Sequence, residues 1–314
     1  MQLPSLLLVA ASSVAFAQTR SSKRGLVYVP NTDSPEDDKI WIQSDSDLTW
    51  YYNYEYTPSS AFSSVPQDQF EFVPMLWGSI DDTGFLDSVQ NQIDGGLNIT
   101  HVLGFNEPDS PYNGGSNIEP SKAADVWVKN IAPLADKGVK LGLPACTGGT
   151  DGLPWLRQFL ANCSQLISTD DEQKNCTYDF VALHWYGNFE GLASHMGEYA
   201  AEFPNVTQWI TEYNYDNQDL STTQSFYNTS SEYFDRIDYV GRYSMFGSFR
   251  SKDSNVGPNA VMLNNDGQLT DIGAWYLGIT GTGVDPQSGE GRHLTPSLAV
   301  IVFSLAIGTL AILW

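Results

Sequence analysis

The chain has 314 residues, of which 41% are hydrophobic and 17% are charged, so it is long and apolar enough to bury the core of one large domain or two small ones. Acidic residues outnumber basic ones by 37 to 15, which gives a formal net charge of −22. Because a phosphate backbone is bound through Lys and Arg, this balance excludes a nucleic-acid partner and leaves neutral ligands open.

The first 17 residues have the pattern of a secretion signal peptide. A short apolar run is followed by Ala15-Phe16-Ala17, a small-x-small cleavage motif, so we expect cleavage after Ala17. The polar residues 18–24 end in Lys23-Arg24. This dibasic pair is either a protease site that removes a propeptide of residues 18–24 or an uncut charged linker.

Eight short segments of the chain are typical of buried β-strands, and each ends in polar, aromatic or glycine residues. Their apolar residues run continuously instead of alternating, which indicates strands covered on both faces, as in a parallel sheet. The predicted strands span residues 24–30, 48–54, 71–78, 101–109, 139–147, 179–187, 207–215 and 240–249.

Most of the gaps between these strands have the periodicity of amphipathic helices. Pro120 and Pro154 are plausible helix starts, because proline is favoured in a first helical turn. A last helix is expected near residues 272–277, whereas residues 33–41 and 56–70 are poorly helical. The predicted apolar helix faces comprise Phe85, Leu86, Val89 and Ile93, then Trp127, Ile131 and Leu134, then Leu156, Phe159 and Leu160.

Strands alternating with helices over about 265 residues match an α/β fold of the (β/α)8 TIM-barrel type, whose usual length is about 250 residues. A doubly wound open sheet is the alternative. That fold would need a glycine-rich phosphate loop after an early strand, and the sequence has none. We therefore predict a single barrel domain over residues 25–280.

The cysteines and glycosylation motifs agree with secretion. Cys163 and Cys176 are expected to close a short loop as a disulfide in an oxidising compartment. Cys146 lies in an apolar predicted strand and is expected to be a buried thiol. Five Asn-x-Ser/Thr sequons are present, at Asn98, Asn162, Asn175, Asn205 and Asn228.

The C-terminal residues have the pattern of a lipid-anchor signal. Residues 298–314 are apolar and uncharged, and a polar spacer at 281–297 contains small residues, with Gly289 as the preferred attachment site. The alternative is a retained tail anchor at the lower length limit for a membrane span. We expect a secreted protein held by a GPI anchor at the plasma membrane, in the cell wall, with no other membrane contact.

Two predicted strands deliver a glutamate to their carboxyl ends. Glu107 follows an apolar run that Pro108 ends, and Glu212 lies near the end of residues 207–215. In a barrel the carboxyl ends of the strands meet at one face, which holds the active site. Since sugar hydrolysis uses a pair of carboxylates across the glycosidic bond, the two glutamates are candidate catalytic residues.

Side chains that suit a carbohydrate ligand crowd the same strand ends, because aromatic faces offer sugar C–H groups an apolar platform. Alternate strand residues point to opposite faces, so we expect some of these side chains to pack away from the pocket. No histidine or cysteine spacing fits a metal site, and we expect no metal and no cofactor. The candidates are Trp77, His184, Trp185, Tyr186, Tyr213 and Tyr215.

Three motifs, GFNEPD at 104–109, ALHWYG at 182–187 and WITEYN at 209–214, resemble glycoside hydrolase family 128. This family comprises fungal β-1,3-glucanases that include the alkali-sensitive linkage proteins, and the resemblance extends from residue 25 to residue 278. It also places the chain in the clan of retaining glycosidases built on this barrel. It implies that β-1,3-glucan is the polysaccharide substrate.

The resemblance also implies roles for single residues. Glu107 would be the general acid/base, Glu212 the nucleophile and Asn106 the partner of the sugar 2-hydroxyl. His184 and Tyr186 would line the site and orient the nucleophile, and Trp77 would be a sugar platform. Trp185 and Tyr213 would be further substrate contacts.

The chain departs from the clan at the eighth strand, where a Trp is common and this sequence has Phe246 and Phe249. The contacts around the cleaved bond are therefore expected to differ. We predict a monomeric retaining endo-β-1,3-glucanase, or a transglycosylase if a sugar hydroxyl replaces water. The alternative is a surface-anchored glucan-binding protein, which needs the aromatic residues but neither carboxylate.

Overall fold

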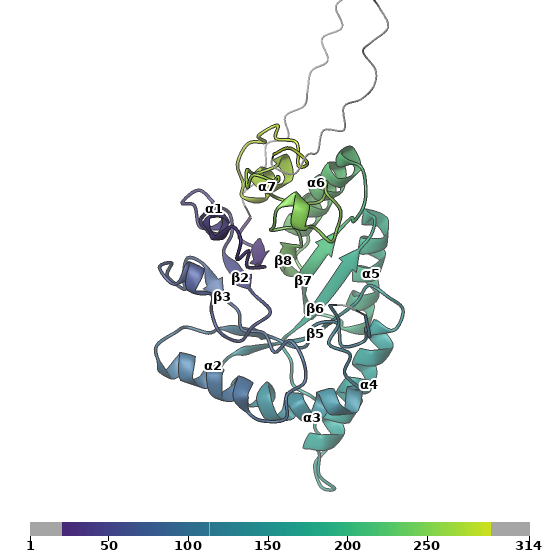
Figure 1. Cartoon of the computed structure of the whole chain (residues 1–314). Helices are drawn as coiled ribbons and strands as arrows, with labels where there is room; N and C mark the ends of the chain where they lie inside the picture. The colour runs from purple at the N-terminus through teal and green to yellow at the C-terminus, as the bar shows by residue number, and fades with distance from the viewer. Residues whose placement is uncertain (1–20, 113, 290–314) are drawn as a thin grey trace, which may run out of the picture.

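The computed structural model describes residues 21–112 and 114–289 (Figure 1). The predicted signal peptide and the apolar tail at 298–314 lie outside the described residues, as do residues 18–20 and the spacer beyond residue 289. Within the described part of the chain, no helix is both long enough and apolar enough to cross a bilayer.

The described residues contain eight parallel strands in two sheets, and each strand lies inside a predicted segment (Figure 1). The first sheet has the order β1 (Gly25–Val27), β2 (Trp50–Tyr52), β3 (Glu71–Phe72). The second sheet has the order β4 (His101–Leu103), β5 (Lys140–Cys146), β6 (Phe180–Tyr186), β7 (Thr207–Asn214), β8 (Val240–Met245).

The two sheets meet at both edges, so the strands form a barrel-like ring. Parallel bridges join Arg24 to Tyr243, between β1 and β8, and Met75 to Leu103, between β3 and β4. At the second junction the backbone N–H of Leu103 donates to the carbonyl of Pro74 at 2.9 Å. The carboxyl ends of all eight strands therefore face the same side of the molecule, as the prediction of the site requires.

Helices cover the outside of the ring after strands β3 to β7, and α3 begins at Pro120 as predicted (Figure 1). A 3-10 helix extends α3, and a further 3-10 helix precedes the last helix. The elements are α2 (Gly84–Asp94), α3 (Pro120–Asn130), η3 (Ala132–Lys137), α4 (Gly152–Ile167), α5 (Phe189–Glu202), α6 (Leu220–Arg236), η4 (Ser251–Asp253) and α7 (Asp271–Tyr276).

The first two gaps between strands depart from the regular barrel. Only η1 (Pro35–Asp37) and the short α1 (Asp38–Trp41) separate β1 from β2, and η2 (Ser60–Phe62) lies between β2 and β3. These segments lack an apolar stripe of helical period, so their loops cover the strands with single aromatic contacts, such as Phe62 on Tyr51 at 4.9 Å between ring centres. The outer ring of helices is therefore incomplete on this side.

Lys23 and Arg24 belong to the folded domain. The ammonium of Lys23 donates to the carbonyl of Phe234 at 2.9 Å. Arg24 is only 2% exposed, and its guanidinium lies 3.3 Å from Asp47 and 3.4 Å from Asp235. Cleavage after Arg24 would remove these contacts, and both the propeptide of residues 18–24 and the uncut charged linker stay predictions.

The predicted disulfide between Cys163 and Cys176 is present and ties α4 to the segment before β6. Cys146 is a buried free thiol, as expected, and its burial raises its pKa. Every sequon asparagine is at least partly exposed, so glycosylation, which stays a prediction, is sterically open at Asn98, Asn162, Asn175, Asn205 and Asn228.

Candidate active site

The carboxyl ends of the strands surround a cavity of about 520 Å³ that contains both predicted glutamates. Loops after β1, β2, β3, β4, β7 and β8 contribute to its walls, together with the last residues of β6 and β7. The predicted site residues that line it are Trp77, Asn106, Glu107, Tyr186 and Glu212.

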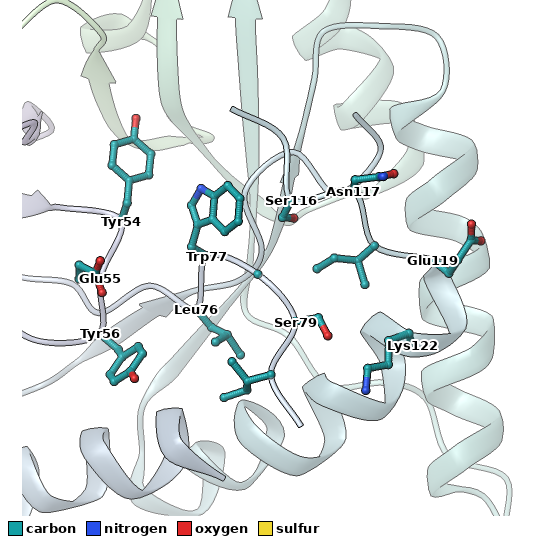
Figure 2. Close-up of a pocket in the computed structure, with 13 residues that line it drawn as sticks. Tyr54, Glu55, Tyr56, Leu76, Trp77, Ser79, Ser116, Asn117, Glu119 and Lys122 are labelled. Atoms are coloured by element: carbon teal, nitrogen blue, oxygen red, sulfur yellow. The ribbon is translucent and has the colours of Figure 1, made fainter. Parts of the chain in front are cut away.

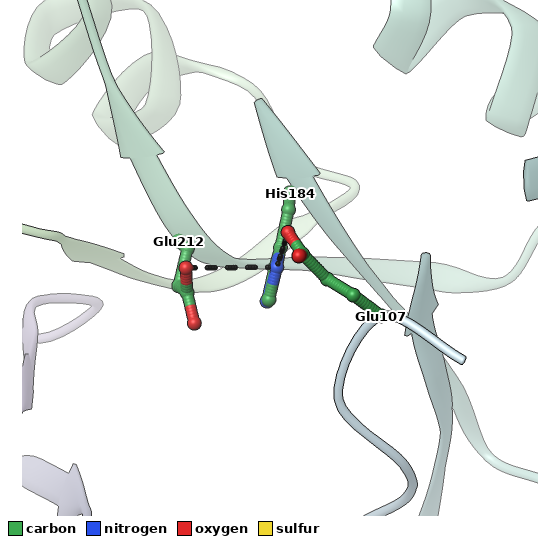
Figure 3. Close-up of side chains that lie close together, drawn as sticks. All are labelled: Glu107, His184 and Glu212. Atoms are coloured by element: carbon green, nitrogen blue, oxygen red, sulfur yellow. Dashed lines mark hydrogen bonds and ion pairs between the residues drawn. The ribbon is translucent and has the colours of Figure 1, made fainter. Parts of the chain in front are cut away.

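Glu107 and Glu212 converge on His184 (Figure 3). The Nδ1 atom of His184 lies 3.0 Å from Oε1 of Glu107 and 3.7 Å from Oε2 of Glu212. This nitrogen and one oxygen from each carboxylate all lie within 4.8 Å of one another. Folding therefore brings two acids from distant parts of the sequence to face each other in one cavity.

The same three groups are close enough to hold a divalent cation, because each offers one ligand atom within 4.8 Å of the others. A carboxylate pair that cleaves a glycosidic bond requires no metal, however. Cleavage by such a pair uses only side chains of this chain.

The backbone at Glu107 is strained. β4 ends four residues earlier, and Glu107 has a φ of 42°, in the left-handed region that L-residues with large side chains rarely adopt. Its N–H donates to the carbonyl of Ala145 at 2.7 Å, and its carbonyl accepts from the N–H of Ser110 at 3.0 Å. These bonds hold the residue in place, since strain of this kind persists only where the surroundings impose it.

A β-bulge in β7 sets the direction of Glu212. Ile210 lies opposite Leu183 of β6, but the register then shifts, and Glu212 lies opposite His184. The inserted residue is Thr211. Because side chains alternate between the two faces of a strand, the insertion turns Glu212 toward the same side as His184.

Two hydrogen bonds from other strands hold this bulge. The carbonyl of Thr211 accepts from the hydroxyl of Tyr52, at the end of β2, at 2.9 Å and from the hydroxyl of Ser244, in β8, at 2.5 Å. β2 and β7 are not neighbours in the ring, so the side chain of Tyr52 reaches across the barrel interior. The direction of the glutamate thus depends on packing between distant strands.

Two tyrosines hold the carboxylate of Glu212. The hydroxyl of Tyr54 donates to Oε1 and that of Tyr186 donates to Oε2, both at 2.7 Å. Burial and the negative charge of Glu212 raise the pKa of both phenols well above the usual value, so both remain protonated donors. Tyr186 was predicted from the sequence. Tyr54 was missed, although it lies two residues after the end of β2, at a carboxyl strand end like those that carry the predicted site residues.

His184 is fully buried between the two acids. Burial alone lowers the pKa of the imidazole, but the charge of Glu212 and the hydrogen bond and charge of Glu107 outweigh burial, and the pKa is raised. In its protonated form the imidazole offsets negative charge in the cavity.

We expect the raised pKa of His184 to make stability depend on pH. The unfolded value is about 6.5, so the stabilisation is complete below that pH and is lost as the pH rises through the higher folded value. In thermal unfolding between pH 5 and pH 9, the melting temperature should fall less steeply toward alkaline pH in His184→Asn than in the wild type.

His195 offers a control of opposite sign, because burial lowers its pKa. Its contribution to stability is lost as the pH falls, so His195→Asn should change the acidic side of the profile. Parallel curves for the wild type and His184→Asn would contradict the assignment of charge at His184.

Trp185 and Tyr213 do not line the cavity, because they alternate along β6 and β7 with the residues that do. Tyr213 is fully buried and packs against Phe234, with 5.0 Å between ring centres. Trp185 packs against His195, with 5.3 Å between ring centres. Their predicted contact with a sugar is therefore wrong, and both fill the layer between the strands and the helices.

The other predicted contacts, Asn106 and Trp77, line the cavity. Asn106 donates through Nδ2 to the carbonyl of Gly114 at 2.7 Å, while its buried Oδ1 has no protein partner among the described residues. Trp77 is 41% exposed and presents its ring to the cavity. Phe246, which follows β8, lines the cavity. Phe249 packs against it, with 5.3 Å between ring centres.

A second cavity, of about 710 Å³, adjoins the first (Figure 2). Both cavities are lined by Tyr54 and Trp77, and the second extends to Asn117 and to Lys122 in the first turn of α3. The two cavities are therefore neighbours that share two aromatic side chains.

The charges of the first cavity favour a neutral ligand. Three carboxylates, those of Glu107, Glu212 and Asp216, line it, and none of its described lining residues is lysine or arginine. An anionic polymer would therefore be repelled at the reacting pair.

The chain matches a family model described as the glycosyl hydrolase catalytic core over residues 25–276. Alkali-sensitive linkage protein 1 of Schizosaccharomyces pombe is 29% identical over 266 residues, which are 82% of this chain and 44% of that protein. The chain thus spans less than half the length of this relative.

Solved structures share the fold. A GH128 (subgroup II) endo-β-1,3-glucanase from Pseudomonas viridiflava is 25% identical with a TM-score of 0.67, covering 84% of this chain and all of that one (100%). A GH128 (subgroup VII) oligosaccharide-binding protein from Cryptococcus neoformans is 24% identical with a TM-score of 0.58, covering 83% of this chain and 96% of that one. The same architecture is thus found in both an enzyme and a binding protein.

Proposed function

Because the chain belongs to glycoside hydrolase family 128, through the glycosyl hydrolase catalytic core that spans residues 25–276, we propose that it is a retaining glycosidase acting on β-1,3-glucan. One observation carries the proposal: oxygens of Glu107 and Glu212 lie within 4.8 Å of each other. Retaining pairs are about 5–5.5 Å apart, whereas inverting pairs are about 6.5–9.5 Å apart to leave room for a water molecule.

In the first step, a carboxylate oxygen of Glu212 attacks the anomeric carbon, and the bond from that carbon to the glycosidic oxygen breaks. The electron pair of the broken bond stays on the leaving oxygen, which takes the proton of Glu107. The products are a glycosyl ester on Glu212 and a shortened glucan. The unpartnered Oδ1 of Asn106 is placed to accept a hydrogen bond from the sugar 2-hydroxyl.

In the second step, a water molecule attacks the same carbon from the opposite face, and Glu107, now a carboxylate, takes its proton. The ester bond breaks, its electron pair returns to Glu212, and the sugar leaves with its original configuration. A sugar hydroxyl in place of water completes a transglycosylation by the same exchange. The imidazolium of His184 would offset the negative charge that changes place between the two acids.

Incubation with a soluble β-1,3-glucan tests this proposal. New reducing ends should appear, and proton NMR of the first products should show the β-anomer before mutarotation. Appearance of the α-anomer first would exclude the double displacement. β-1,4- and β-1,6-linked oligosaccharides of equal length serve as controls for linkage preference.

We propose internal cleavage of the chain, because the second cavity offers room for further sugar units beyond the reacting pair. Trp77 separates the two cavities as an exposed aromatic face. Trp77→Ala should lower kcat/KM on the polymer about 10-fold, the effect of one lost aromatic platform. The lengths of the early products from a long glucan report the cleavage mode.

Tyr239→Ala is the matched control, since Tyr239 is another exposed aromatic residue that lines neither cavity. It should leave kcat/KM unchanged. Release of glucose alone by the wild type would contradict internal cleavage, and equal losses in both variants would remove Trp77 from the binding surface.

The alternative function is glucan binding without cleavage, and the likeness in fold to the oligosaccharide-binding protein favours its consideration. A binder has no use for two facing carboxylates, one of which, that of Glu212, accepts a hydrogen bond from a tyrosine at each oxygen. A wild-type protein that binds the glucan in a pull-down, yet releases no reducing ends, would establish this alternative.

We propose that the protein acts as a secreted, GPI-anchored monomer at the cell surface, in the cell wall. The support comes from the sequence patterns at both termini, with attachment near Gly289, and from the accessible sequons. Release of the protein from intact cells by a phospholipase that cuts GPI anchors tests the anchor.

A further inference from the structure

Tyr54 has a strained backbone, as Glu107 does. Among the described residues, five non-glycine residues have a positive φ, and three of them are asparagines, which adopt this region readily. The other two are Tyr54, with a φ of 63°, and Glu107, with a φ of 42°. Strain of this kind is typical of functional sites. Both of these residues belong to the pair of carboxylates or contact it: Glu107 is one of the two acids, and Tyr54 donates to the other, Glu212.

Local hydrogen bonds hold the loop that carries Tyr54. The side chain of Asn53 accepts from the N–H of Glu55 at 3.3 Å and donates to the carbonyl of Thr57 at 3.1 Å. The carbonyl of Glu55 accepts from the N–H of Met75 at 3.0 Å, which ties the loop to the end of β3. The phenol is thus held in position before any ligand binds.

The two tyrosines that contact Glu212 are not equivalent. Oε2 accepts from Tyr186 and also lies 3.7 Å from Nδ1 of His184, so two donors lie near this oxygen. Oε1 accepts from Tyr54, and no second donor to it is found among the described residues. Loss of the Tyr54 hydroxyl therefore leaves one oxygen of the carboxylate without a protein donor.

We propose that Tyr54 is a further catalytic residue, whose hydroxyl stabilises the carboxylate of Glu212 as it leaves the glycosyl ester in the second step. This inference rests on the double displacement proposed above. A hydrogen bond to a full negative charge is stronger than one to a neutral ester. In the first step Glu212 loses its charge and the bond weakens, whereas in the second step the charge returns and the bond strengthens.

The hydroxyl therefore favours breakdown of the ester over its formation, because only interactions that strengthen toward the transition state accelerate a step. The phenol keeps its proton throughout, and the electron pair of the breaking ester bond goes to Glu212. Tyr54 thus moves no proton and forms no covalent bond.

Tyr54→Phe, which removes only the hydroxyl, tests this role on an aryl β-glycoside with a good leaving group. Loss of one hydrogen bond to a charged group should slow ester breakdown about 10- to 100-fold. We expect kcat and KM to fall together because the ester accumulates, with kcat/KM unchanged or raised because the lost bond weakens during ester formation. Mass spectrometry of the quenched enzyme should show a larger glycosylated fraction, with the sugar on the peptide that contains Glu212.

Tyr239→Phe is the matched control, because Tyr239 is exposed and lines neither cavity. It should keep wild-type kinetics, and circular dichroism should show that both variants fold. An active wild type with a Tyr54→Phe variant that loses kcat and kcat/KM equally, or loses neither, overturns the role of Tyr54 alone. A wild type that cleaves no glycoside overturns the proposed function and this inference together.

Discussion

Replacing Glu212 with glutamine is expected to lower kcat on β-1,3-glucan by about 10⁴- to 10⁶-fold, the range for removal of a nucleophile that acts with its neighbours as a unit. The amide lacks the negative charge that attacks the anomeric carbon, and it loses the pairing with His184. Glu107→Gln should cost about 10²- to 10⁴-fold, as for a lost general acid. New reducing ends measure both effects, and binding to the glucan should persist.

Small anions distinguish the two roles. Azide in the space left by Glu212→Ala should attack the substrate directly and form the α-glycosyl azide. Azide in Glu107→Ala should attack the ester on Glu212 and form the β-glycosyl azide. Glu190→Gln, an exposed change on α5, should leave the activity intact. Wild-type activity in either glutamine variant would exclude that glutamate from the chemistry.

The largest expected effect on stability comes from Arg24. Replacing it with methionine removes the cation that lies between Asp47 and Asp235 and leaves two acids without it. Removing one partner of a buried ion pair typically costs about 3–5 kcal/mol. Urea unfolding, followed by tryptophan fluorescence, should show this loss in the free energy of unfolding.

Lys39→Met is the control for this change, because Lys39 is exposed and the same substitution there should be nearly neutral. N-terminal sequencing of the secreted protein gives an independent check. A mature chain that starts at Gly25 and unfolds as cooperatively as one that contains Arg24 would contradict the structural role of this arginine.

The positions of the strands and of both acids could be predicted because they depend on local sequence. Continuous apolar runs mark strands that are covered on both faces, and Pro108 marks the loop after β4 that carries Glu107. A run of β-branched and aromatic residues at 207–215 likewise predicted β7, with Glu212 near its end. The helices after β3, β4 and β5 followed from the 3.6-residue period of their apolar side chains.

Other features depend on contacts between distant segments and were not predictable. Nothing in the local sequence signals the inserted Thr211, because its carbonyl is held by Tyr52 and Ser244 from other strands. Tyr54 was missed since its strain and its bond to Glu212 exist only in the folded ring. Periodicity alone did not separate residues that face the cavity from alternate ones, hence the error at Tyr213.

The bulge in β7 has a consequence for anyone who would transplant this chemistry to another scaffold. A designer who copies the two glutamates onto a barrel with evenly paired strands would obtain the correct residue types with one of them facing the surrounding helices. The inserted Thr211 would have to be copied as well, together with Tyr52 and Ser244, whose hydroxyls donate to its carbonyl. In this protein, the direction of the Glu212 side chain depends on three strands, β2, β7 and β8.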